Sequence, residues 1–470
     1  MSPDDKLTMD PNRRMARFAA KDDLGALSGN AREAAVWQLA DTVAVGWAGS
    51  DANGVAEATD VMIAEGGVQD VPLWGRNERV NGSQAAFVNG VAGAALDFDS
   101  VHQESLLHPA VITVPVALSL GSLIGATGEK VVSAHLVGCE VMCRISLATP
   151  RQSNWFPASV FGIYGATATA ARLLDLDEER TLNAFGLALA QTSGTKQAIM
   201  ERTLAKRFQT AFAVRAGLLA AQLAARGVTA ATQFLDGQAG LFALYGPGDP
   251  DKACEGLGDE YVFEQTTIKK YPSCLCTHVV IEGVRRLKER HNIELNDVKD
   301  ITITITEYMN KLVGGEYDPG ADPQVAAQFS AAYASVCMLK HGNMTLGDID
   351  LQAATDPDMV RLARWVKVQT FDDNDGHVAP ACVSISLKNG ETFTEKVTQV
   401  PNAADGPNAA ETFRGKLIDC LQRGHRPLTA PDAGRLCNRL LGIDDANDVR
   451  QLFDNQQEEP TTKVNNETSA

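Results

Sequence analysis

The sequence predicts a mainly α protein, built from a large all-helical domain and a smaller α+β lid domain. Through about the first 260 residues, apolar side chains recur at the spacing of amphipathic or buried helices. Beyond that point Ile and Thr alternate over residues 301–306, as in a half-buried strand, and Asn389-Gly390 separates two further extended runs, as in a hairpin. Residues 410–441 return to the helical pattern. The chain is therefore expected to leave the helical domain for the lid and then to return to it.

The helices expected before the lid span 31–47, 84–96, 110–125, 130–148, 160–174, 178–190 and 212–225. In the first of them Leu39 and Val43 lie near one stripe, whereas Arg32 and Asp41 lie elsewhere, as in an amphipathic helix. The segment 110–125 is apolar almost all round, which predicts a buried helix. Short connections between such helices predict antiparallel neighbours in one helical domain.

The lid is expected to combine strands at 301–305, 366–370, 383–387 and 392–397 with helices at 278–291 and 325–339. This assigns 20–262 together with 405–450 to a discontinuous helical domain, and 263–404 to the lid. Residues 451–470 are polar and acidic, so they are expected to form a disordered tail.

Net charge restricts the partners. The 470 residues include 42 Lys or Arg and 59 Asp or Glu, a formal net charge of −17. Such a surface repels nucleic acid and anionic membranes, so neither is expected as a partner, and a polyanionic substrate would need cations gathered locally. No run is long and apolar enough to span a bilayer, and residues 1–20 lack the apolar segment of a secretory signal, which favours the cytoplasm.

The nine cysteines indicate free thiols rather than a disulfide framework. Their number is odd and their spacing irregular, which is typical of a reducing compartment. Cys274 and Cys276 form a C-x-C, and Cys139 and Cys143 lie one helical turn apart, but no second pair with matching spacing completes a zinc site. Nucleotide-binding motifs are also missing from the sequence. The sequence therefore predicts neither a metal site nor a nucleotide-binding site.

Four stretches of the chain, taken in order, resemble the motifs of one family. They are AALDFDSVH (94–102) followed by LLHP (106–109), VFG (160–162) followed by GA (165–166), KRF (206–208), and IKKYP (268–272) followed by TH (277–278). On these motifs the chain is similar to the MmgE/PrpD family, which includes 2-methylcitrate dehydratase, cis-aconitate decarboxylase and iminodisuccinate epimerase. The resemblance extends over residues 30–400.

The resemblance implies a homodimer in which the helical domain and the lid enclose a site that works without a cofactor. The first expectation is a lyase, of the dehydratase or decarboxylase type, acting on a small di- or tricarboxylate. The second is an isomerase that removes and returns a proton α to a carboxylate, as in epimerisation. The third is a catalytically silent, dimeric binding protein. The sequence identifies neither the substrate nor its stereochemistry, and it does not separate lyase from isomerase.

His108 is the first candidate for proton transfer. An imidazole titrates near neutral pH and can accept or deliver a proton next to a carboxylate. His108 precedes Pro109 in the loop that opens the helix predicted at 110–125, and a helix N-terminus attracts anions. The alternative is a buried structural histidine, but the place of His108 in the motif favours the functional role.

Asp97, Lys206 and Lys269 are the other residues expected to take part in catalysis. The resemblance favours Asp97 over Asp99, with orientation of His108 or His102 as a suitable task; alternatively, both carboxylates brace the loop. The resemblance also makes Lys206 and Lys269 carboxylate clamps, one from each domain, although most lysines are simply solvated. Closure of the lid would bring both cations to the substrate and exclude water.

Further residues are expected to contact the substrate. They are His102, Arg207, Lys270, Cys274 and Tyr333, with Lys196 and Arg202 as weaker candidates. Each has a structural alternative, because Lys and Arg are usually solvated and helix-spaced aromatic residues usually belong to the core.

The chain departs from the family pattern at Ser100 and Val101, where the motif has an aspartate and a threonine, and at three histidine positions. Phe156, Gln209 and Cys274 stand where members of the family carry histidines. A pocket with fewer histidines is less basic and carries fewer exchangeable protons, which fits poorly with a tricarboxylate decarboxylase. These departures therefore predict a different or smaller substrate, and they leave His108 with more of the proton chemistry.

Overall fold

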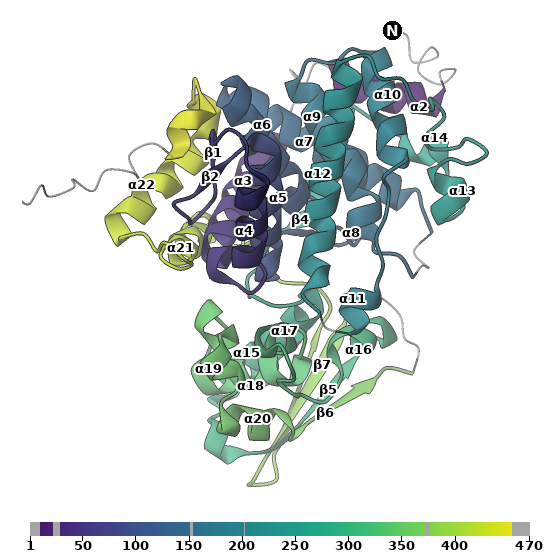
Figure 1. Ribbon diagram of the computed structural model, residues 1–470. Helices are drawn as coiled ribbons and strands as arrows, with labels where there is room; N and C mark the ends of the chain where they lie inside the picture. Colours follow the sequence, from purple (N-terminus) through teal and green to yellow (C-terminus); the bar gives the residue numbers. More distant parts are fainter. Residues whose placement is uncertain (1–9, 22–28, 151–153, 202, 373–376, 454–470) are drawn as a thin grey trace, which may run out of the picture.

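The computed structural model describes residues 10–21, 29–150, 154–201, 203–372 and 377–453. A large helical body lies beside a smaller part that contains a four-stranded sheet (Figure 1). This confirms the predicted mainly α fold class. Most of the predicted tail, 454–470, lies outside the described residues. Its predicted start at 451 is too early, because the 3-10 helix η7 (Val449–Phe453) buries Leu452 against the helical body.

The long helices of the body are α3 (Gly29–Ala48), α5 (Gly82–Ala95), α6 (Ala110–Ile124), α7 (Gly128–Leu147), α9 (Gly162–Leu173), α10 (Glu178–Leu189) and α12 (Ala205–Ala225). Most begin and end within a few residues of the predicted positions. Helix α12 is the exception, since it begins well before residue 212. The early start agrees with the helix propensity of Ala, Lys and Arg. Lys206 and Arg207 therefore lie in the first turn of α12 and not between two helices.

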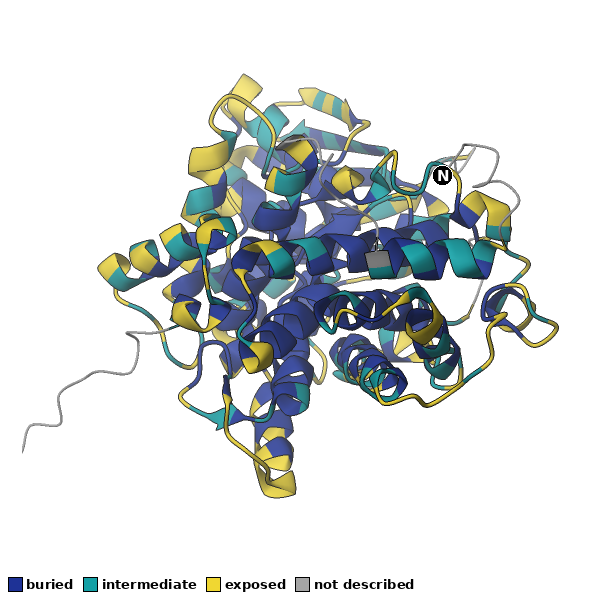
Figure 2. Cartoon of the chain, turned by 90° about the horizontal axis from the view of Figure 1, so that it is seen from above, coloured by how far each residue is buried: buried dark blue, intermediate teal, exposed yellow. Residues whose placement is uncertain are grey.

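Helix α6 lies at the centre of the body and packs against α5, α7, α9 and α12. Its residues from Ala110 to Ser122 are all buried, and Figure 2 shows the central helices mostly in the colour of buried residues. Helices α7 and α9 approach each other closely at Gly138 and Gly165. A Cβ atom on Gly138 would lie 2.6 Å from the Gly165 carbonyl oxygen, so a side chain there would force the two helices apart.

Shorter elements complete the body: α2 (Pro11–Lys21), α4 (Val55–Glu65), β1 (Val71–Pro72), β2 (Arg79–Val80), α8 (Pro157–Val160), α11 (Gln197–Met200), α13 (Leu241–Tyr245) and α14 (Pro250–Ala253). Helix α2 begins before the predicted domain start at residue 20, and it packs against α9 and α10 and buries Met15 and Phe18. Among the described residues, no helix has both the length and the apolar character needed to cross a membrane.

The lid sheet consists of β5 (Val298–Ile305), β6 (Val366–Thr370), β7 (Ala381–Leu387) and β8 (Thr392–Val397), in the order β6-β5-β7-β8. Strand β5 runs parallel to β6 and antiparallel to β7, and Asn389-Gly390 turns β7 into β8. Ile301, Ile303 and Ile305 are buried. They belong to the face of the sheet that α15 (Leu275–His291) and α18 (Ala331–His341) cover.

The helix predicted at 325–339 is instead two helices, α17 (Pro323–Gln328) and α18. The interruption has a local cause. The Ser330 hydroxyl accepts a hydrogen bond from the Tyr333 amide at 3.1 Å and so caps a new helix. The other helices of the lid are α16 (Glu307–Val313), α19 (Leu351–Ala354) and α20 (Pro357–Ala363).

After the lid the chain returns to the body as α21 (Ala409–Leu421) and α22 (Ala430–Leu441), which pack against α3 (Figure 1). Lys416 of α21 is buried against this surface. Its Nζ lies 2.6 Å from Oδ1 of Asp41 on α3 and donates to the carbonyl oxygens of Phe98 and Lys269 at 3.0 and 2.9 Å. Helix α21 therefore supports two segments that border the cavity described below.

The connection into the lid is fixed by a buried ion pair on α7 and by a short ladder. Glu140 accepts from the amides of Val262 and Phe263 at 3.2 and 3.1 Å, and it is paired with Arg144. Strand β3 (Val101–His102) then pairs antiparallel with β4 (Thr266–Thr267). This ladder places the start of the lid beside the loop that follows α5.

Candidate active site

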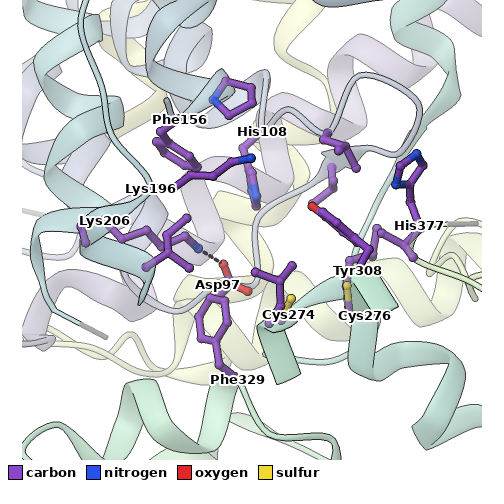
Figure 3. Close-up of a pocket in the computed structure, with 18 of the residues that line it drawn as sticks. Asp97, His108, Phe156, Lys196, Lys206, Cys274, Cys276, Tyr308, Phe329 and His377 are labelled. Atoms are coloured by element: carbon purple, nitrogen blue, oxygen red, sulfur yellow. Dashed lines mark hydrogen bonds and ion pairs between the residues drawn. The ribbon is translucent and has the colours of Figure 1, made fainter. Parts of the chain in front are cut away.

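A cavity of about 1230 Å³ lies between the helical body and the lid (Figure 3). Its wall takes residues from α5, α7 and α12 on one side and from α15, α16 and α17 on the other. Six of the residues predicted for the site line this cavity, namely Asp97, His108, Lys206, Arg207, Lys269 and Cys274. Segments far apart in the sequence therefore meet at one cavity.

The loop between α5 and α6 brings the acidic residues and His108 together. The chain turns at Asp97, whose φ of 49° lies in the left-handed region that Asp tolerates better than most residues. Further along, the His102 amide donates to the Leu107 carbonyl at 2.9 Å, and the Leu107 amide donates back at 3.3 Å. This closed loop returns His108 to the side of Asp99, just before α6 begins.

Asp97 is the centre of a buried ion cluster. Its Oδ1 accepts a short hydrogen bond from Nζ of Lys206, and its Oδ2 lies 3.1 Å from Nζ of Lys269. Nζ of Lys269 also donates to the main-chain carbonyl of Asp97 at 2.6 Å. Burial alone would raise the pKa of Asp97, but the charges of Lys206, Lys269 and His108 outweigh burial and hold that pKa well below its ordinary value. Asp97 is therefore a fixed anion that positions two lysines.

Asp99, rather than Asp97, contacts His108. Oδ2 of Asp99 lies 2.7 Å from Nδ1 of His108, and the carboxylate is buried. Burial raises the pKa of Asp99, and His108 more than offsets this effect, so the pKa is lowered. An ionised Asp99 fixes the imidazole with its proton on Nδ1 and leaves Nε2 as the ring nitrogen that can exchange a proton with a substrate.

The family motif favours Asp97 over Asp99 for the orientation of a histidine, whereas in the structure Asp99 is the carboxylate that contacts His108. The sequence does indicate a carboxylate partner for the histidine, because the motif DFD contains two acidic residues. Their order could not be decided from the sequence, since the left-handed turn at Asp97 determines which carboxylate faces which partner.

Three predicted substrate contacts, His102, Lys270 and Tyr333, are not among the described residues that line the cavity. His102 is fully buried; its Nδ1 accepts from the Ser105 amide at 3.1 Å, so Nε2 donates to the Val262 carbonyl at 2.8 Å. Its contacts hold the β3 loop against the connection to the lid. These contacts are those expected if His102 has a structural role.

Tyr333 and Lys270 also have other neighbours. The Tyr333 hydroxyl donates to the Asp348 carbonyl at 2.6 Å within the lid core. The Nζ of Lys270 lies 5.6 Å from the centroid of the Tyr271 ring. Adjacent residues of one motif, Lys269 and Lys270, therefore differ: one is buried beside Asp97 and the other is partly exposed.

Other lining residues were not predicted or were rated as weaker candidates. Lys196 points toward His108 and Phe156, while Tyr308 and His377 come from the lid (Figure 3). Burial lowers the pKa of Lys196. Tyr308 and His377 have no local sequence signal, because they reach the cavity only through the packing of the lid. Arg202 lies outside the described residues.

Within the described parts of the chain, no three His, Cys, Asp or Glu residues are gathered in a way that could hold a metal ion. The absence of a cofactor nevertheless stays a prediction that only a measurement on the protein can test.

Two protein-family models match this chain. Residues 13–253 match the MmgE/PrpD N-terminal domain, and residues 271–426 match the MmgE/PrpD C-terminal domain. The chain belongs to the MmgE/PrpD family. This confirms the resemblance seen in the motifs.

Curated relatives of this MmgE/PrpD protein cover most of its length. The cis-aconitate decarboxylase-like protein oryM of Aspergillus oryzae is 26% identical over 446 residues, which are 88% of this chain and 90% of the relative. The cis-aconitate decarboxylase of Mus musculus is 26% identical over 400 residues, 81% of this chain and 80% of the relative. The Homo sapiens cis-aconitate decarboxylase is 26% identical over 344 residues, 69% of each chain.

The three departures from the MmgE/PrpD pattern differ in position. Phe156 and Cys274 line the cavity. Gln209 does not; its side-chain oxygen accepts from the Thr195 amide at 2.7 Å and supports the segment that carries Lys196. Two of the three positions at which the sequence predicts a departure therefore face the cavity.

Proposed function

We propose that the protein is a lyase that acts on a small polycarboxylate by general acid–base catalysis. The observation that carries this proposal is the Asp99–His108 pair at a cavity that also contains a cluster of lysines and an arginine. Family members of the decarboxylase type support the reaction class. Such a site can move a proton next to a carboxylate and hold the negative charge that develops.

His108 performs the proton transfer in this proposal. In a dehydration, Nε2 takes the proton from the carbon next to a carboxylate, and the electron pair forms the double bond as hydroxide leaves the neighbouring carbon. The imidazolium formed in this way gives its proton to the departing hydroxide, which leaves as water. In a decarboxylation, the electron pair left by carbon dioxide takes a proton from an imidazolium. Asp99 balances the charge of that imidazolium in both cases.

The cations bind the carboxylates and the developing enolate. Lys206 and Arg207 lie in the first turn of α12, and Lys206 is held by Asp97, so its ammonium needs little reorganisation when charge develops. Lys269 is almost completely buried beneath Asp97. Its role is to fix Asp97 and Lys206 more than to touch the substrate.

The reaction class is tested by NMR in deuterated water with malate, 2-methylmalate, citrate, 2-methylcitrate and cis-aconitate. A new alkene from any of the four hydroxy acids, or carbon dioxide from cis-aconitate, supports the lyase. Deuterium uptake without net conversion would favour the isomerase, and binding without either change would favour a silent binding protein. The last two outcomes each contradict the proposal.

The absence of a cofactor, the homodimer and the cytoplasmic location belong to the same proposal. Activity is expected to survive exhaustive dialysis against a chelator. Loss of activity that a divalent metal restores would contradict this part of the proposal and leave the reaction class intact.

A further inference from the structure

We propose that Cys274, activated by Cys276, is a nucleophilic thiol that small α,β-unsaturated carboxylic acids modify covalently when they enter the cavity. The acid–base chemistry proposed above gives this side chain no task. Three features on the lid side of the cavity point to the new role: the fixed backbone around Cys274, its thiol neighbour, and the N-terminus of α15.

Cys274 is held in place at the cavity wall. Its amide donates a hydrogen bond to the Gln328 carbonyl at 2.9 Å, and its carbonyl accepts from the amide and the hydroxyl of Thr277, each at 2.9 Å. These contacts fix the backbone on both sides of the side chain. Cys274 and Cys276 both line the cavity, and in Figure 3 their sulfur atoms lie on the lid side, whereas His108 comes from the helical body. The Cys274 thiol therefore borders the space that a bound acid would occupy.

The surroundings of Cys274 favour its thiolate. A hydrogen bond from the Cys276 thiol lowers the pKa of Cys274, and the charge of Lys269 acts in the same direction. Burial and the charge of Asp97 raise that pKa, but they do not cancel the decrease. Cys274 is also the N-cap of the 17-residue helix α15, and the dipole at this end of a helix favours an anion. Because the thiolate is the reactive form of a cysteine, Cys274 is a nucleophile.

The other eight cysteines are in a different state. The hydrogen bond to Cys274 raises the pKa of Cys276, which therefore keeps its proton. Cys382, on strand β7, is the most exposed of the nine, and it is not among the described residues that line the cavity. Exposure and thiolate character thus select different cysteines. Burial raises the pKa of the remaining seven, namely Cys139, Cys143, Cys254, Cys337, Cys382, Cys420 and Cys437.

The addition of an unsaturated acid to Cys274 needs no further reactant. The thiolate sulfur attacks the β-carbon of the alkene, and a carbon–sulfur bond forms as the π electrons move toward the α-carbon and its carboxylate. The α-carbon then takes a proton from the imidazolium of His108, and a thioether remains. The part of His108 in this step rests on the proposed function. The step adds a thiol to the alkene where the reverse of a dehydration adds water.

The carboxylate makes such an acid a suitable ligand for this cavity. Lys206 and Arg207 line the same cavity as Cys274, so the cations that bind a substrate also bind the unsaturated acid. A dehydration next to a carboxylate itself makes an alkene of this class. The proposed lyase reaction therefore produces, beside Cys274, a compound that can inactivate the site.

The first test uses acrylamide, a neutral alkene that reacts with thiolates, and maps the modified cysteines of the native full-length chain by peptide mass spectrometry. At neutral pH, we expect alkylation of Cys274 to be at least about tenfold faster than that of Cys382, although Cys382 is more exposed. Cys276→Ala removes the hydrogen-bond donor, so it should slow the reaction of Cys274 several-fold at neutral pH and not in alkaline solution. Cys437→Ala, the matched control, should leave the rate at Cys274 unchanged. Faster modification of Cys382 than of Cys274, or an unchanged rate in Cys276→Ala, would overturn the proposal.

The second test replaces acrylamide with fumarate, an unsaturated dicarboxylate. A succinyl thioether should form on Cys274 in step with the loss of turnover, and tricarballylate, a saturated acid that competes for the cavity, should slow both. Reaction of Cys274 with acrylamide and not with fumarate would overturn the assignment to carboxylic acids. An adduct in a protein that converts no hydroxy acid would support covalent capture and contradict the lyase. Turnover by a protein that forms no adduct at Cys274 would overturn covalent capture and leave the lyase standing.

Discussion

His108 and Asp99 act as one unit, because each determines the state of the other. Asp99 is buried and has its pKa lowered by His108, while His108 is held at Nδ1 by Asp99. Loss of the carboxylate would free the ring to rotate and to place its proton on the wrong nitrogen. Both residues should therefore affect turnover much more than substrate binding.

We expect His108→Ala and Asp99→Asn each to lower kcat roughly a hundredfold or more, with KM changed only a few-fold. The matched control is His341→Ala, which removes a histidine that lies 2.6 Å from Asp348 outside the cavity wall described above. Steady-state kinetics check the prediction. A similar loss of kcat in the control, or full activity in Asp99→Asn, would contradict it.

The two lysines bound to Asp97 should differ in what they support. Lys269 has only 1% of its side chain exposed, whereas Lys206 has 20%. Lys269→Met leaves Asp97 and its carbonyl short of a buried partner, so it should cost about 3–5 kcal/mol of unfolding free energy. Lys206→Met should cost less stability and raise KM more. Equal losses of stability in urea titrations of the two variants would refute this division.

Asp41 makes the stability depend on pH. Burial raises its pKa to about 6, even with Lys416 beside it, against about 3.9 in the unfolded chain. The folded state therefore holds the proton more tightly, and stability contributed by protonated Asp41 is lost as pH rises from about 4 through 6. The unfolding free energy of the wild type, minus that of Asp41→Asn, should fall by up to about 3 kcal/mol over this range. A difference that rises with pH would contradict the assignment.

At the scale of elements, α21 reaches the site through one side chain. Lys416 joins Asp41 of α3 to the carbonyls of Phe98 and Lys269, so a C-terminal helix supports both the DFD loop and the entry to the lid. Helix α21 thus contributes to the geometry of a cavity that it does not line.

Lys416→Met should lower stability by about 3–5 kcal/mol, because Asp41 is left buried without its cation. It should also lower kcat, since Phe98 and Lys269 lose a common donor. The double variant Asp41→Asn/Lys416→Met should recover part of the stability but not the activity. Urea unfolding and kinetics on the same samples check both expectations, and full activity in Lys416→Met would contradict the supporting role of α21.

How much was predictable differs from element to element. The isoleucines of β5 and the Asn389-Gly390 turn determine local conformation directly, so these elements were found from the sequence. The split of residues 325–339 depends on one hydroxyl cap, and the burial of α2 depends on α9 and α10, which a local pattern does not contain. Among the site residues, the motifs predicted His108 and the lysines. The positions of Tyr308 and His377 at the cavity depend on tertiary packing alone.

At the scale of the whole molecule, the expected homodimer requires a surface to bury. Phe212 and Leu219 lie two turns apart on α12, and they are 55% and 44% exposed. We predict that sedimentation gives twice the mass of the chain and that Phe212→Glu shifts the protein toward the monomer. Leu351→Glu on the lid, where the leucine is 68% exposed, is the control and should not change the mass. A monomeric wild type would contradict the prediction.

The return of the chain to α3 also has a consequence for biosynthesis. Helices α21 and α22 cover α3, yet the whole lid is translated before them. A nascent chain that has emerged from the ribosome only as far as the lid therefore presents an uncovered apolar face to the cell. Such an intermediate is expected to bind chaperones. A gene truncated before α21 should yield inclusion bodies, even though it encodes all the described residues that line the cavity.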